Sequence, residues 1–125
     1  MGDRKVPMRN FHDAEMLSVR IDGKDIELGF RDIDGLHYRL TLKGVRSFVV
    51  DNFLSGNIIF ELLIQELSDF DQREIDELLP IEMKIDLDKL RRIGGGQEFK
   101  LIRVEPSYGA VLRAVAADCE LKIEA

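Results

Sequence analysis

The chain has 125 residues, a size typical of one domain that buries an ordinary core without metal or disulfide support. Its net charge of −6 opposes binding to nucleic acid, and no apolar run approaches the roughly 20 residues of a membrane helix. Cys119 is the single cysteine, which excludes an intrachain disulfide. The N-terminal residues lack the apolar core of a secretory signal, so we expect a cytoplasmic protein whose one domain spans residues 1–125.

The first half of the chain has the alternation of apolar and polar residues that is typical of strands. Residues 1–10 have no such period and contain Pro7, so we expect a loose N-terminal arm there. Asp22-Gly23 and Gly35 mark tight turns, and Gly44 interrupts the pattern once more. The expected strands, which form an antiparallel meander, cover residues 17–21, 26–30, 38–42 and 45–51.

Residues 58–67 fit two patterns. As a helix, this segment leaves Phe60 and Ile64 outside its apolar face. As a strand, it places Ile58, Phe60, Leu62 and Ile64 on one face. We adopt the strand because it exposes fewer large apolar groups, and the helix stays open as an alternative.

A short helix is predicted over residues 72–79. Asp71 and Glu74 have the spacing of a capping box, in which each side chain accepts a hydrogen bond from the other residue's backbone. Apolar residues then recur at helical spacing, and Pro80 ends the helix.

The last third of the chain again alternates. Residues 81–87 predict a strand, although residues 87–93 could instead form a helical turn that ends at the glycines 94–96. Further strands are expected over 99–105 and 110–124, separated by a turn at 106–109. We therefore predict a mostly β (α+β) fold, an antiparallel sandwich or open barrel of seven or eight strands with one short helix.

The negative charge is concentrated in one segment. Residues 61–77 contain seven acids and one base, so this segment carries the whole net charge. A solvated helix face explains such a run, but the strong local potential also suits a basic protein partner. The candidate partner-binding residues are Glu66, Asp69, Asp71, Glu74, Asp76 and Glu77, with Tyr108 at the predicted turn.

A second candidate site lies before the first strand. His12 and Asp13, together with His37, could supply nitrogen and oxygen ligands to a divalent metal. The simpler interpretation is that His12 or Asp13 caps a turn that leads into the strand. No nucleophile or phosphate-binding motif accompanies these residues, so we expect a non-enzymatic protein without a cofactor.

The run from Phe11 to Val19 resembles the signature of a family of predicted bacterial immunity proteins from polymorphic toxin systems. The resemblance continues at Gly44-Val45, Asn57-Ile58-Ile59 and Ser107-Tyr108-Gly109. It implies a cytoplasmic, non-enzymatic protein that binds a toxin.

Three hypotheses about function follow. The first is an immunity-type binding domain whose acidic segment meets a basic toxin. The second is a metal- or small-ligand-binding protein that uses the region around His12 and Asp13. The third is a homodimer or larger assembly formed through exposed strand edges.

Overall fold

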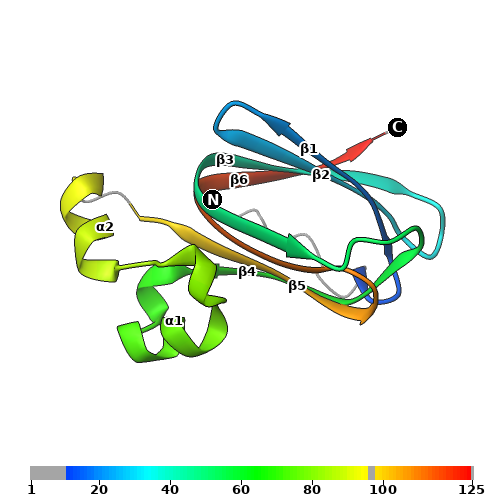
Figure 1. The fold of residues 1–125 in the computed structure, drawn as a ribbon. Helices are drawn as coiled ribbons and strands as arrows, with labels where there is room; N and C mark the ends of the chain where they lie inside the picture. The colour runs from blue at the N-terminus through cyan, green and yellow to red at the C-terminus, as the bar shows by residue number, and fades with distance from the viewer. Residues whose placement is uncertain (1–10, 96–97, 125) are drawn as a thin grey trace.

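The computed structural model describes residues 11–95 and 98–124. This part of the chain contains six strands and two α-helices (Figure 1). The strands are β1 (Glu15–Asp22), β2 (Asp25–Arg31), β3 (His37–Asp51), β4 (Asn57–Glu66), β5 (Lys100–Tyr108) and β6 (Val111–Glu124). Between β4 and β5 come the 3-10 helix η3 (Leu67–Asp69), α1 (Gln72–Leu78), the 3-10 helix η4 (Ile81–Met83) and α2 (Leu87–Gly94). The mostly β class is confirmed, whereas the predictions of seven or eight strands and of one helix are wrong. The arm expected at residues 1–10 lies outside the described residues.

The strands form one antiparallel sheet in the order β1-β2-β3-β6-β5-β4, which closes by pairing β4 with β1. The closing contact is short, with Glu15 opposite Ile58 and Met16 opposite Asn57. By contrast, β3 and β6 pair along most of their length. The sheet is therefore closed, in place of the predicted sandwich or open barrel.

Strand β3 joins two segments that the sequence predicts as separate strands. Gly44 has a φ of +61° and lies just before the point, between Val45 and Ser47, where the register with β6 shifts. A bulge with a left-handed glycine bends a strand without ending its pairing. The interruption at Gly44 is thus a bend within one long strand.

The segments after β3 confirm some predictions and correct others. Residues 58–66 lie in β4, as the strand assignment expects, while Leu67 begins η3, and α1 carries the predicted capping box at Asp71 and Glu74. The strand predicted over residues 81–87 is wrong, because η4 and then α2 occupy this region. Asp86 caps α2 by accepting a hydrogen bond from the Lys89 N–H at 3.1 Å, and this local cap overrides the alternating pattern.

The turn predicted at residues 106–109 is displaced toward its end. Strand β5 continues through Pro106 to Tyr108, and the chain turns at Gly109 and Ala110. Pro106 lies opposite Ile59, beside shifts in the register between β4 and β5. A proline is tolerated there because the ladder is already irregular.

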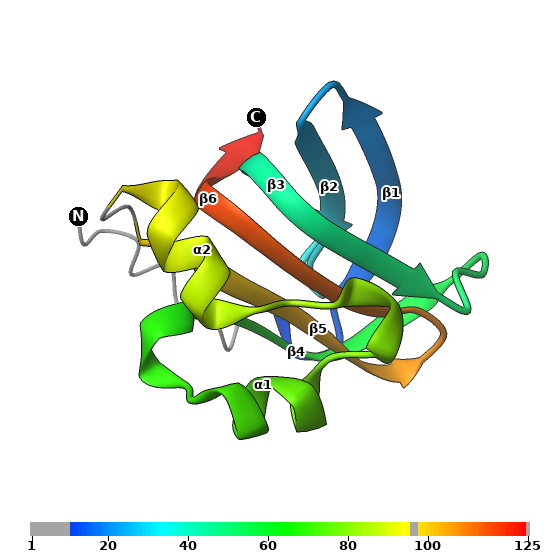
Figure 2. The ribbon, with the colours of Figure 1, turned by 60° about the vertical axis from the view of Figure 1, so that its left-hand side comes forward.

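Two apolar cores hold the structure together. The first fills the closed sheet with side chains that include Leu28, Leu40, Leu62 and Leu112. The second lies between the helical segment and the outer face of the sheet, and its buried members are Leu67, Ile75, Leu79, Met83, Leu87, Leu90, Phe99, Leu101 and Val115. Figure 2 shows α1 and α2 on the side of the sheet where β4, β5 and β6 run. This second core fixes the position of the acidic residues on the helices.

Candidate functional site

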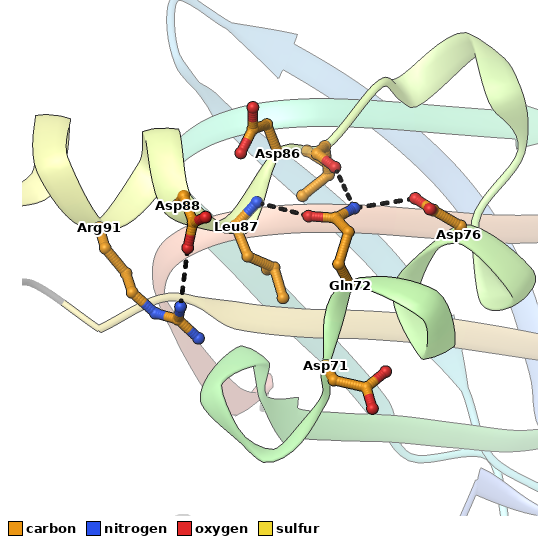
Figure 3. A pocket seen from close by; sticks show the side chains of 8 residues that line it. Asp71, Gln72, Asp76, Asp86, Leu87, Asp88 and Arg91 are labelled. Carbon is orange, nitrogen blue, oxygen red and sulfur yellow. Dashed lines mark hydrogen bonds and ion pairs between the residues drawn. The ribbon is translucent and has the colours of Figure 1, made fainter.

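An acidic groove lies between α1 and α2 (Figure 3). Its volume is about 510 Å³. Asp71, which caps α1, and Asp76 within α1 line one side, while Asp86, which caps α2, and Asp88 within α2 line the other. Gln72, Ile85, Leu87 and Arg91 complete its lining. The groove is therefore strongly negative, with the Arg91 guanidinium as its basic group among the described lining residues.

Gln72 holds the two walls of the groove together. Its side-chain Nε2 donates to Asp76 Oδ1 and to the carbonyl oxygen of Ile85, each at 2.8 Å. Its Oε1 accepts from the Leu87 N–H at 2.9 Å. One side chain of α1 thus satisfies backbone groups on both sides of the residue that caps α2. This contact sets the spacing between the acidic residues of the two helices.

Some of the groove's acids also stabilise the helices that carry them. Asp71 Oδ1 accepts from the Glu74 N–H at 2.8 Å, while Glu74 Oε1 accepts from the Asp71 N–H at 2.9 Å. Asp86 caps α2 in a similar way. A carboxylate at the N-terminus of a helix interacts favourably with the positive end of the helix dipole. Asp71 and Asp86 therefore stabilise the helices that hold them in the groove.

The structure brings together part of the predicted partner-binding set. Asp71 and Asp76 line the groove, whereas Glu66 pairs with Lys100 at 2.5 Å and Glu77 pairs with Arg73 at 3.7 Å.

The other predicted residues lie outside the groove. Tyr108 is 58% exposed, but it lies at the end of β5 that is far from the helical segment. Asp69 has no side-chain hydrogen bond or ion pair to the described residues, and Glu74 serves the capping box. The role of all these residues in binding stays a prediction.

Sequence reasoning missed Asp86 and Asp88. Neither is among the predicted partner-binding residues, because the predicted strand over residues 81–87 hides the helix start at which both lie. The signal that identifies them is the spacing from Asp86 to Lys89, which matches a helix N-cap followed by its third residue.

An apolar hollow adjoins the acidic groove. Its volume is about 170 Å³, and its walls include the buried side chains of Leu67, Leu90 and Phe99. Ser68 and Glu98 lie at its exposed margin. Leu87 and Arg91 line both the hollow and the groove, so the two features meet along α2.

An arginine pair ties α1 to the sheet. Arg103 and Arg113 lie opposite each other on β5 and β6, and both contact the Glu105 carboxylate, at 3.4 and 2.8 Å. Arg113 Nε also donates to the carbonyl oxygen of Leu78, at the end of α1, at 3.4 Å. A cation at this end is favourable for the helix dipole, so Arg113 helps to hold α1 in place.

His12 and Asp13, the first candidates for a metal site, have structural contacts. His12 Nδ1 lies 3.0 Å from the carbonyl oxygen of Phe60, and its ring meets the Phe60 ring edge-on at 5.4 Å. Asp13 donates its backbone N–H to the carbonyl oxygen of Ile59 at 2.9 Å. These contacts fasten the entry of β1 to β4.

His37 lies at the start of β3, opposite Arg31 on β2 and Glu124 on β6. The Glu124 carboxylate accepts a hydrogen bond from the Arg39 guanidinium and raises the pKa of that guanidinium. The acid opposite His37 is therefore already paired with an arginine. Residues 11–95 and 98–124 contain no group of three histidine, cysteine or acidic side chains placed to hold a metal ion. The metal hypothesis therefore gains no support from the geometry and stays a prediction.

Segments that carry the family resemblance meet at the buried side chain of Asn57. Its Oδ1 accepts from the N–H groups of Leu54 and Ala110, at 2.8 and 3.1 Å. Its Nδ2 donates to the carbonyl oxygens of Met16 and Leu54, at 3.2 and 2.6 Å. Asn57 thus joins β1, the loop before β4 and the turn after β5. These contacts give the Asn57 and Gly109 segments a role in closing the sheet.

Comparisons with known proteins give no family assignment. No family model matches the chain, and neither a curated protein nor a solved structure matches it. Among the described residues, the helices are too short and too polar to cross a membrane. The acidic groove and the apolar hollow beside it are the features that bear most directly on function.

Proposed function

We propose that this chain is a small non-enzymatic binding protein that holds a basic protein partner in the acidic groove between α1 and α2. The observation that carries the proposal is that four exposed aspartates, Asp71, Asp76, Asp86 and Asp88, line one groove. Opposite charge on two surfaces speeds their encounter and disfavours wrong partners. Capped helices fixed by a separate core present these charges on a rigid support.

The proposed partner is a toxin domain, so the chain would act as an immunity-type protein. The resemblance of Phe11 to Val19 to predicted immunity proteins supports this choice. The sign of the charge supports it as well, because enzymes that act on nucleic acid present basic surfaces to the phosphates. An acidic protein that covers such a surface would block it.

Co-expression tests this proposal. Each protein encoded beside this chain's gene is expressed alone and together with the chain in a bacterial host. We expect one of these proteins to be basic, to arrest growth alone and to be neutralised by the chain. Neutralisation should fail when Asp76 and Asp88 are both changed to asparagine. It should persist when two exposed aspartates outside the groove, Asp22 at the end of β1 and Asp34 in the turn before β3, are changed in the same way.

The proposal is contradicted if no neighbouring product is toxic or binds the chain. It is also contradicted if both double variants neutralise a toxin as well as the original chain does. In that case the charge of the groove is irrelevant to binding.

A further inference from the structure

We infer that the partner anchors itself by placing one apolar side chain, flanked by lysine or arginine, into the hollow beside the acidic groove. This inference rests on the proposed function and specifies the chemistry of the partner. It makes the hollow the anchoring point and the groove the place where the flanking cations lie.

The hollow has the size and lining for one large apolar side chain. Its volume is about 170 Å³, and an apolar cavity of about 150 Å³ is large enough to hold benzene. Leu67, Leu87, Leu90 and Phe99 each expose less than a tenth of their surface, so the walls are already fixed in the second core. A preformed apolar pocket costs little ordering on binding.

The charges around the hollow determine what should flank the anchor. Arg91 lies where the hollow meets the groove, and its Nη1 is 3.3 Å from the Asp88 carboxylate. The guanidinium is thus compensated within the protein. The other charged residue that lines the hollow is Glu98, and the groove on the other side carries aspartates. Cationic side chains on the partner complement this margin.

An anchor surrounded by charges has a distinct energetic signature. Aromatic or aliphatic side chains that enter fixed pockets commonly dominate the affinity of an interface. Exposed charges around them mainly affect the rate of association and its dependence on salt. We therefore expect the hollow to control how tightly the partner is held and the groove to control how salt weakens binding.

Two short synthetic peptides test the inference. One has a phenylalanine flanked by lysines on both sides, and the other has alanine in its place. Each is titrated into the isotope-labelled full chain, and backbone resonances are followed by NMR. The phenylalanine peptide should bind at least roughly tenfold more tightly, which corresponds to about 1.4 kcal/mol, because its ring leaves water on entering the hollow. It should shift resonances of Leu90 and Phe99 in addition to those of the groove.

A filled hollow provides the matched variant. Ser68 is exposed at the margin of the hollow, so the ring introduced by Ser68→Phe should occupy the hollow. The chain should then lose its preference for the phenylalanine peptide. Ser107→Phe, an exposed serine near the far end of β5, should leave that preference unchanged. Circular dichroism confirms that both variants fold. If Ser68→Phe unfolds, the original chain is used instead. Nuclear Overhauser contacts between the peptide's phenylalanine ring and Leu90 and Phe99 support the anchor, and their absence overturns it.

The outcomes separate the two proposals. Equal affinity for both peptides, with shifts confined to the groove, overturns the apolar anchor and leaves the acidic binding surface intact. Loss of preference in both serine variants also overturns the anchor. Absence of shifts around the groove with either peptide counts against the acidic surface itself, and therefore against both.

Discussion

Gln72 and Leu87 are joined by a hydrogen bond of 2.9 Å between the side-chain oxygen of one and the backbone N–H of the other. They are fifteen residues apart in the sequence and belong to different helices. The same amide also donates to Ile85 and Asp76. This small network holds the acidic groove open between α1 and α2, so the shape of the groove depends on Gln72.

Removal of the Gln72 side-chain amide should destabilise the helical segment. Gln72→Ala leaves the Ile85 carbonyl and the Leu87 N–H without their partner, at a cost of about 1–2 kcal/mol. Urea unfolding followed by circular dichroism measures the change. Gln65→Ala, a glutamine on β4 that contacts Arg103, is the control for loss of an amide elsewhere. Amide exchange should accelerate at Leu87 in the first variant and stay unchanged there in the second.

Asp71 separates the structural and electrostatic roles of the acidic residues. Asp71→Asn keeps a capping oxygen, so its stability should stay within roughly 0.5 kcal/mol of the original. Asp71→Ala removes the acceptor for the Glu74 N–H and should cost about 1 kcal/mol. Both variants lose the same charge and should weaken binding of the lysine-flanked phenylalanine peptide equally. Weaker binding by the alanine variant alone would assign Asp71 a purely structural role.

Gly109 lies so close to Asn57 that any side chain at this position should lower the stability of the fold. Gly109 has a φ of +93°, and a Cβ there would lie 2.5 Å from Asn57 Oδ1. Gly35 has a similar φ of +89°, but nothing lies within 4 Å of its Cβ position. Gly35→Ala should therefore cost about 1 kcal/mol from backbone strain alone.

Gly109→Ala should cost at least about 2 kcal/mol more than Gly35→Ala, because it also disrupts the buried hydrogen bonds of Asn57. Thermal unfolding of the two variants side by side gives the difference. Equal losses of stability would show that the Asn57 contacts contribute little to closure of the sheet.

Glu105 should matter more to stability than an exposed carboxylate. Glu105→Gln leaves the facing guanidinium groups of Arg103 and Arg113, both largely buried, without their shared anion. We expect a loss of about 1–3 kcal/mol. Glu120→Gln, whose partner Lys43 is half exposed, should change stability by less than about 0.5 kcal/mol. Denaturant midpoints for the two variants test this contrast.

Patterns among residues close in the sequence were enough to predict the elements that such residues determine. The capping box at Asp71 and Glu74 identified α1, and alternation identified β1, β2 and β4. Alternation failed over residues 81–87 because the Asp86 cap starts a helix there, and α2 confirms the alternative helical turn over residues 87–93. Gly44 did not reveal the single long strand, because a glycine with positive φ occurs both at a bulge within a strand and at a turn that ends one.

The candidate site was harder to predict than the fold. The excess of acids in residues 61–77 was visible, but most of these carboxylates lie outside the groove. The groove exists because Gln72 bonds across to the start of α2 and brings Asp86 and Asp88 opposite Asp71 and Asp76. Such a contact between distant residues leaves no periodic signal in the chain.

The most direct test of the acidic groove is the affinity of the lysine-flanked phenylalanine peptide for two double variants at low and moderate salt. Asp76→Asn with Asp88→Asn removes two of the four acidic charges that line the groove. The turn pair, Asp22→Asn at the exposed end of β1 with Asp34→Asn in the turn before β3, removes the same charge elsewhere. We predict that the groove pair weakens binding about tenfold at low salt and reduces its salt dependence, while the turn pair changes little. Equal weakening by the two pairs would contradict the groove as the binding surface.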